Sequence, residues 1–225
     1  MEPCKRLLLA NRAWATERLK IDPEYFAKRV KTQAPEFLWI GCSDSRVPSE
    51  EITGAEPGEL FVHRNIANIV VPTDIDMLSV VQYAVEALNI QHIIICGHYN
   101  CGGVKSAMST RSAGPISLWL QPLRDLYGMN REEIESVADE QGRWDRLVEI
   151  NVRAQVCALA QTAIIRRAWQ RQQGPEIHGW VYNLRSGFLN EFVSMHVEAI
   201  ADNLHPLQAP REVEASETRF MRHLR

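Results

Sequence analysis

The chain has 225 residues, of which 45% are hydrophobic and 24% are charged, a composition that excludes collagen-like, disordered and coiled-coil classes. Its length favours a single domain, residues 1–225, with terminal extensions. The net charge of −3 provides no positive field that would attract nucleic acid or an anionic membrane surface, so we predict neither partner. Apolar runs such as Ile93–Cys96 fall far short of the roughly 18 residues that span a bilayer.

Residues 1–34 predict a helical arm. Apolar and charged residues are mixed at helical spacing, and Pro23 divides the pattern into two amphipathic helices. The apolar run Leu7–Ala10 is cut short by Asn11 and is too brief for a secretory signal, so we expect a cytoplasmic protein. In a reducing compartment, five cysteines indicate thiols or metal ligands rather than a disulfide framework.

Residues 35–190 predict an α/β core in which strands alternate with helices. Strands are expected at 37–41, 59–65, 92–96 and 177–183, one helix at 76–88 with Asp76 as its N-cap, and one long helix at 144–172. This alternation predicts a central, mainly parallel β-sheet flanked by helices, with ligand sites beyond the carboxyl ends of the strands. Residues 191–225 are weakly patterned and are interpreted as a C-terminal extension.

Two clusters of reactive side chains follow predicted strands. Cys42, Asp44 and Arg46 come after the first strand, and His98 and Cys101 come after the third. Two thiolates and one imidazole suit tetrahedral zinc, and three protein ligands leave the fourth position for water, as in catalytic sites. The glycines around His98 and Cys101 permit the tight backbone path that a shared ion requires. We predict that Cys42, His98 and Cys101 bind zinc.

The cysteines and the Asp44–Arg46 pair also have simpler interpretations. A redox pair is disfavoured because the chain contains no Cys-x-x-Cys sequence. Cys4, Cys96 and Cys157 are interpreted as small apolar residues of a helix or strand. An Asp-x-Arg pair is usually an ordinary surface ion pair, but the position of Asp44 and Arg46 beside Cys42 favours a role in the site.

From about Leu9 to Leu189 the chain resembles the β-class carbonic anhydrases of the bacterial type. The resemblance rests on Cys-x-Asp-x-Arg at 42–46, His-x-x-Cys at 98–101, and EPGELFVHRN at 56–65 between them. It implies one zinc ion per subunit and the reversible hydration of carbon dioxide to bicarbonate and a proton by zinc-bound hydroxide. It also implies that Arg46 holds Asp44 so that Asp44 orients the nucleophile. In a closed state, Asp44 becomes a fourth zinc ligand.

The resemblance extends to two further sets of residues. A pocket for inhibitory bicarbonate, found in a regulated subgroup, matches Trp39, Arg64 and Tyr182. The substrate-binding residues implied are Phe61, Ile66, Tyr83, Gly102 and, from a partner subunit, Gln33. A partner-supplied residue requires a homo-oligomer, a dimer or a dimer of dimers (homotetramer). Because two thiolates cancel the charge of the ion, activity should favour alkaline pH. The regulatory pocket implies sigmoidal inhibition by bicarbonate and a steep loss of activity as pH falls.

Two alternative functions remain open. A relative on the same scaffold could hydrolyse carbon disulfide or carbonyl sulfide, because a fold does not determine a substrate. A non-catalytic zinc-binding module would instead keep Asp44 permanently on the metal, giving a closed four-ligand site.

Overall fold

The structure is a computed structural model that describes residues 2–109 and 113–196. The chain divides into two compact units, residues 1–34 and residues from 35 onward, which are described separately. Of the predicted C-terminal extension, 191–225, the structure describes residues 191–196, and residues 197–225 lie outside the described part.

The first unit contains α1 (Pro3–Ile21) and the short α2 (Ala27–Val30). As predicted, the helical pattern breaks around Pro23, whose ring cannot continue a helix. The rings of Trp14, Tyr25 and Phe26 pack edge to face, with centroids 5.1–6.2 Å apart. No side chain of α1 is buried, and its apolar residues Leu7, Leu8 and Trp14 are exposed.

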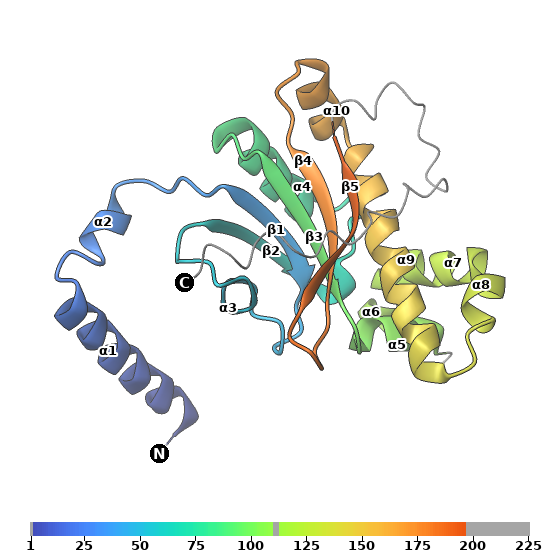
Figure 1. Cartoon of the computed structure of the whole chain (residues 1–225), viewed down its shortest axis with the longest axis horizontal. Coiled ribbons are helices and arrows are strands. Elements are labelled where there is room, and N and C mark those ends of the chain that lie inside the picture. The colour runs from blue at the N-terminus through green and yellow to red at the C-terminus, as the bar shows by residue number, and fades with distance from the viewer. Residues whose placement is uncertain (1, 110–112, 197–225) are drawn as a thin grey trace, which may run out of the picture. The chain divides into compact units, whose positions relative to one another are not determined.

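A five-stranded sheet in the order β2-β1-β3-β4-β5 forms the centre of the second unit (Figure 1). The first four strands are parallel, and they are β1 (Phe37–Cys42), β2 (Leu60–Asn65), β3 (His92–His98) and β4 (Glu176–Tyr182). The predicted class, a mainly parallel sheet flanked by helices, is confirmed.

The fifth strand was not predicted. β5 (Leu189–Met195) pairs antiparallel with β4 and extends the sheet beyond the expected core boundary at residue 190. As an edge strand it carries polar residues, Asn190, Glu191 and Ser194, which obscure the apolar signal of a buried strand. The tight turn before it uses Gly187, whose φ of 77° is readily adopted by glycine.

Ten α-helices and two short irregular helices are described in the two units. Those of the second unit are α3 (Ser49–Thr53), η1 (Ile66–Asn68), α4 (Ile75–Gln82), η2 (Tyr83–Ala87), α5 (Gly102–Met108), α6 (Pro115–Trp119), α7 (Gln121–Met129), α8 (Arg131–Glu135), α9 (Glu140–Ala160) and α10 (Ala163–Gln170). Across the described ranges, none of the helices meets the length and apolarity needed to cross a bilayer.

Two helix predictions were wrong in detail. The N-cap of α4 is Asp74 rather than Asp76, and its carboxylate accepts a hydrogen bond from the Asp76 N–H. The predicted helix 144–172 is two helices, because Thr162 adopts an extended backbone and its hydroxyl accepts the Ile165 N–H as the cap of α10.

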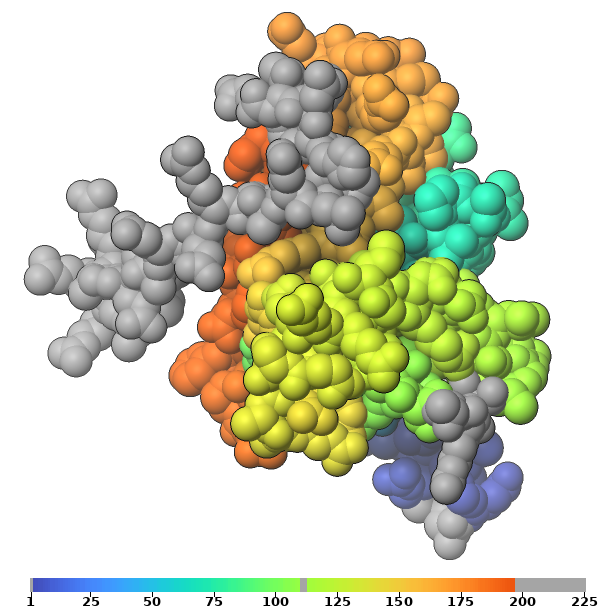
Figure 2. Space-filling view, turned by 90° about the vertical axis from the view of Figure 1, so that its right-hand side faces the viewer, coloured from blue at the N-terminus to red at the C-terminus, as the bar shows by residue number. Residues whose placement is uncertain are grey.

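The two faces of the sheet are covered differently. Helices α4, α9 and α10 bury the face that carries Leu38, Ile40 and Ile95, whereas the opposite face carries a smaller cluster centred on Trp39. Along β4, buried and partly exposed residues alternate, as expected for a strand with one well-covered face. Figure 2 shows α7, α8 and the start of α9 at one end of the second unit and α10 at the other.

Candidate metal centre

The three predicted metal ligands meet at the carboxyl edge of the parallel sheet. Cys42 is the last residue of β1, His98 is the last residue of β3, and Cys101 is the N-cap of α5. The adjacent strands β1 and β3 are in parallel register, so their ends lie next to each other. All three side chains are buried, and their ligand atoms lie within 4.8 Å of one another. The structure therefore forms the group that the spacing predicted.

The geometry of this group fits a tetrahedral metal ion. The two sulfurs are 4.0 Å apart, close to the about 3.8 Å that a tetrahedral zinc ion with its usual sulfur bond length would impose. The Nε2 atom of His98 is buried and has no hydrogen-bond partner, although buried polar atoms nearly always have one. Its Nδ1 atom lies 3.0 Å from the Tyr99 carbonyl, and donation to that oxygen leaves Nε2 as the ligand atom.

The Cys42 and Cys101 side chains share a hydrogen bond between their sulfurs. A hydrogen bond from the Cys101 thiol, followed by the proximity of His98, holds the pKa of Cys42 well below its usual value. The same hydrogen bond, together with burial, raises the pKa of Cys101. The Sγ atom of Cys42 also accepts the Ala67 N–H at 3.4 Å. The site thus already stabilises one thiolate, the form that binds metal.

A carboxylate clamped by a guanidinium borders the three ligands. Arg46 donates to both oxygens of Asp44, through Nε at 2.9 Å and Nη2 at 2.7 Å, and its backbone N–H donates to Oδ1 at 3.0 Å. These bonds hold the pKa of Asp44 far below its usual value, so the carboxylate is ionised. The Oδ2 atom of Asp44 lies 3.7 Å from His98 Nε2, which places the charge beside the ligand group.

A buried network of side-chain amides, which was not predicted, supports Cys42 through Ala67. Ala67, in η1, has a φ of 65° and points its N–H at the Cys42 sulfur. The carbonyl of Ala67 accepts a hydrogen bond from the side-chain amide of Asn151 at 3.0 Å. The side-chain amide of Gln155 donates to the Asn151 oxygen, and its own oxygen accepts the Val70 N–H. Asn151 and Gln155 lie four residues apart on the apolar face of a helix. This pattern is a sequence signal for a buried hydrogen-bond network, because buried amides need partners.

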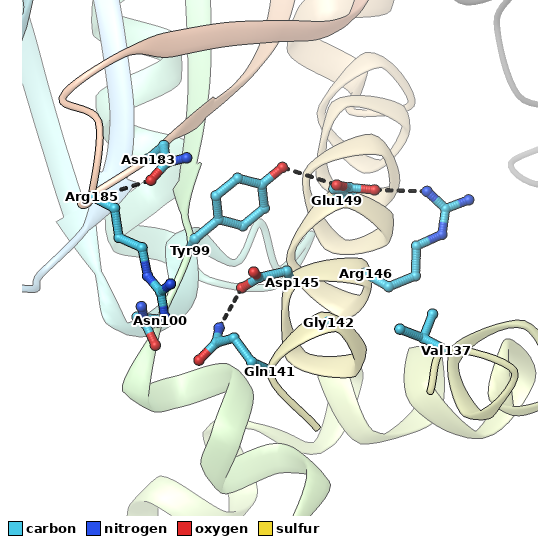
Figure 3. Close-up of a pocket in the computed structure, with 10 residues that line it drawn as sticks. All are labelled: Tyr99, Asn100, Val137, Gln141, Gly142, Asp145, Arg146, Glu149, Asn183 and Arg185. Atoms are coloured by element: carbon cyan, nitrogen blue, oxygen red, sulfur yellow. Dashed lines mark hydrogen bonds and ion pairs between the residues drawn. The ribbon is translucent and has the colours of Figure 1, made fainter. Parts of the chain in front are cut away.

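The loop between His98 and Cys101 is braced against α9. The Tyr99 hydroxyl donates to Glu149 at 2.9 Å, and Arg146 binds the other oxygen of Glu149 at 2.7 Å (Figure 3). These side chains border a pocket of about 490 Å³ that also contains Asn100 and Asp145. Burial raises the pKa of Asp145. The bracing holds the loop that carries two of the three ligand positions.

Tyr99→Phe is expected to loosen this loop without removing a ligand. Loss of the hydroxyl should lower the free energy of unfolding by about 1 kcal/mol and weaken metal affinity several-fold. Chelator competition and thermal unfolding measure the two effects. Tyr127→Phe is the matched control, since the Tyr127 hydroxyl donates to Glu135 on the neighbouring helix α8. Equal metal affinity in both variants would contradict the bracing role.

Two of the five predicted substrate-binding residues lie beside the ligand group. Gly102 directly follows Cys101 and begins α5, and a side chain on Gly102 would meet open space. Ile66 begins η1, and its Cγ2 atom lies close to α5, 3.0 Å from the position of a β-carbon on Gly103. Ile66 is 42% exposed and borders a cavity of about 430 Å³ with Ser43.

Of the other three predicted substrate-binding residues, Phe61 and Tyr83 lie away from the ligand group within one chain. Phe61 and Tyr83 pack together with ring centroids 5.8 Å apart. Phe61 precedes Asn65, the register partner of Cys42, by four positions, which corresponds to about 13 Å along β2. Gln33 belongs to the first unit, whose position relative to the sheet is not described. One chain by itself therefore does not gather Phe61 and Tyr83 at the ligand group.

The three residues predicted to bind regulatory bicarbonate share one sheet face. Trp39 and Tyr182 belong to the same apolar cluster, and Arg64 pairs in register with Gly41, two positions after Trp39. The Arg64 guanidinium donates to the carbonyls of Cys42, Asp44 and Val47, at 2.9, 2.6 and 3.0 Å. It is thus connected directly to the loop that carries the Asp44–Arg46 pair.

The fold is that of an α/β protein, and a buried group of Cys42, His98 and Cys101 that could hold a metal ion lies at the carboxyl edge of its sheet. A family model described as carbonic anhydrase matches residues 37–189. A carbonic anhydrase of Emericella nidulans is 44% identical over 186 residues, covering 83% of this chain and 82% of that relative. The chain belongs to the carbonic anhydrase family, in its β class.

Solved structures agree with this assignment. A tetrameric β-carbonic anhydrase of Sordaria macrospora superposes with a TM-score of 0.82 at 41% identity, covering 85% of this chain and 98% of that one. The β-carbonic anhydrase of Aspergillus fumigatus described as CafA superposes with a TM-score of 0.83 at 37% identity, covering 89% and 96%.

Proposed function

We propose that this enzyme catalyses the reversible hydration of carbon dioxide to bicarbonate and a proton, with one zinc ion held by Cys42, His98 and Cys101. The observation that carries the proposal is the buried group of two sulfurs and an unpartnered imidazole nitrogen, at distances that suit tetrahedral zinc. Zinc bound there supplies Lewis-acid activation of water near neutral pH. Family membership supports carbon dioxide as the substrate.

The role of the Asp44–Arg46 pair follows from its charge and position. An ionised carboxylate accepts hydrogen bonds but donates none, so Asp44 orients a nucleophile that still carries a proton. Arg46 occupies both carboxylate oxygens and keeps them from rotating toward the sulfurs. Breaking the pair would free Asp44 to approach the metal as a fourth ligand and close the site. The same carboxylate would then support or block catalysis according to its partner.

We also propose that the active site is completed by a second copy of the chain. Phe61 lies about 13 Å along β2 from Asn65, the register partner of Cys42, and the ring of Tyr83 packs against that of Phe61, so these rings would line a substrate pocket only from a neighbouring subunit. Gln33 lies in the arm, whose unburied apolar residues suit contact with a partner. The Sordaria relative, described as tetrameric, supports a dimer or a dimer of dimers. An exclusively monomeric species in sedimentation under assay conditions would contradict this assembly.

The proposed compartment is the cytoplasm. All five cysteines are free thiols, and the Cys42 and Cys101 ligands must remain reduced to bind metal. The cytoplasm maintains such thiols.

Stopped-flow measurement of carbon dioxide hydration across pH, on protein of known zinc content, tests the reaction. We expect activity that rises toward alkaline pH and depends on zinc. Turnover of carbon disulfide or carbonyl sulfide alone would indicate the alternative hydrolase. Stoichiometric zinc without hydration at any pH would indicate a non-catalytic zinc module.

Bicarbonate inhibition is proposed to act through Arg64. An anion held by Trp39, Arg64 and Tyr182 would withdraw the guanidinium from the carbonyls of Cys42 and Asp44 and so loosen the loop that carries Asp44. The shared sheet face of Trp39 and Tyr182 supports this arrangement.

Trp39→Phe and Tyr182→Phe are therefore expected to weaken bicarbonate inhibition several-fold and to flatten its sigmoidal dependence. Initial rates at increasing bicarbonate concentration provide the measurement. Trp180→Phe is the matched control, because its ring lies on the same face 6.4 Å from that of Trp39. If both test variants kept the parental bicarbonate response and pH profile, the regulatory pocket would be rejected.

A further inference from the structure

A second group of side chains that could hold a metal ion lies at the opposite end of the sheet from Cys42, His98 and Cys101. His92 begins β3 and pairs in register with Glu176, which begins β4, and His178 follows two positions later on the same face. His92 and His98 are the two ends of β3, six residue steps apart, which corresponds to about 20 Å. The two groups are therefore separate sites.

Three ligand atoms of this group converge on one point. The Nδ1 atom of His92 lies 3.3 Å from Nε2 of His178, and the Oε2 atom of Glu176 lies 3.7 Å from each of these nitrogens. A tetrahedral zinc ion with ordinary nitrogen and oxygen bond lengths separates its ligand atoms by about 3.4 Å. The observed triangle thus matches the dimensions of a His2Glu metal site before any ion is bound.

We propose that His92, Glu176 and His178 bind a second divalent transition-metal ion, of which zinc fits best. Two imidazoles and one carboxylate form a ligand set that proteins use for zinc. His92 and Glu176 are each partly exposed, 39% and 45%, which gives an ion and a completing water access from solvent.

The surrounding residues orient the ligands as a metal site requires. The Nδ1 atom of His178 lies 2.9 Å from the carboxylate of Glu191, on β5. Donation of that N–H to the carboxylate fixes the tautomer in which Nε2 carries the free lone pair and makes the imidazole a stronger ligand. His196 contacts the second oxygen of Glu176 at 3.2 Å, leaving Oε2 directed at the two imidazoles.

The metal-free alternative is a histidine pair bound to a carboxylate, which the experiments below distinguish from a metal site. A proton shared between His92 and His178 accounts for their contact of 3.3 Å. Oε2 of Glu176 lies 3.7 Å from each nitrogen, beyond hydrogen-bond range but within the range of an ion pair to a protonated imidazole. A common ion accounts for all three separations at once. It would also link β3 to β4 directly and to β5 through Glu191, so its role is to stabilise this end of the sheet.

The test uses the full-length protein as the Cys101→Ser variant, in which the first metal centre is disabled. After metal removal with a chelator, equilibrium dialysis against zinc should show one ion per chain with micromolar or tighter affinity. Adding Glu176→Gln or His178→Ala should weaken that binding at least tenfold. Glu51→Gln, an exposed glutamate on α3, is the matched control and should change nothing.

Cobalt binding provides a readout independent of zinc affinity. In the wild type, one cobalt ion should show thiolate charge-transfer absorption from the Cys2His centre, and a second should show only the weaker ligand-field bands of nitrogen and oxygen ligands. Glu176→Gln should lose the second spectrum and retain the first, with carbon dioxide hydration unchanged. No second ion at micromolar metal, or binding that Glu176→Gln and His178→Ala leave intact, would overturn the proposal as adventitious binding only.

Discussion

Cys101→Ser is expected to lose the zinc ion of the Cys42, His98 and Cys101 site together with carbonic anhydrase activity. Removing the Cys101 thiolate leaves only two ligands, the buried His98 Nε2 and the Cys42 sulfur, where a tetrahedral zinc ion needs three from the protein. Since losing a supporting contact alone typically costs 10–100-fold in metal affinity or activity, the loss of a ligand should reduce activity by more than about 100-fold. Zinc analysis after chelator dialysis and stopped-flow hydration measure the two losses.

The matched control for this prediction is Cys157→Ser, which changes a half-buried thiol on α9 outside the ligand group. It should retain the activity and zinc content of the Cys2His centre. Full activity in the Cys101→Ser variant would exclude the proposed ligand set.

Asp44→Asn is expected to keep zinc and lose activity. The amide has nearly the size of the carboxylate but no charge, so the charge-assisted bonds of 2.7 and 2.9 Å with Arg46 weaken. An amide also presents an N–H donor where the nucleophile needs an acceptor. Since a positioned acid or base contributes about 10²–10⁴-fold to rate, kcat should fall by roughly that factor.

The measurement pairs zinc content with hydration kinetics, and Arg46→Lys extends it. A lysine cannot donate to both oxygens of Asp44, so kcat should fall there too, with zinc retained. Asp125→Asn, on the exposed side of α7, is the control for loss of a carboxylate. A different pair of results would favour the non-catalytic module. If the wild type bound zinc without hydrating carbon dioxide, and Asp44→Asn lost that zinc, Asp44 would be a structural ligand.

Much of the fold was predictable because its signals are local. Buried parallel strands such as β1 and β3 are short apolar runs, and the chain between them carries helical spacing, so class and strand positions follow from pattern alone. The edge strand β5 has no such run and was missed. The break between α9 and α10 depends on the backbone conformation at one residue, Thr162, which weak helix propensities do not determine.

The grouping of Cys42, His98 and Cys101 was predictable for a different reason. Cys42 and His98 each end a strand of a parallel sheet, and this topology alone brings such ends to one edge. The positions of Phe61 and Tyr83 relative to that edge did not follow from the motif, because a motif records residue types and spacing but not the distance along a strand from the site.

The fold class and the grouping of Cys42, His98 and Cys101 could be read from the sequence, since both depend on residue type, spacing and the rule that parallel strands end at one edge. Only the tertiary structure showed that Arg46 holds both oxygens of Asp44 and that Arg64 is bonded to the same loop. It alone brought His92, Glu176 and His178 together from strands more than eighty residues apart in the chain. Contacts between distant segments depend on strand register and side-chain packing, which no local pattern records.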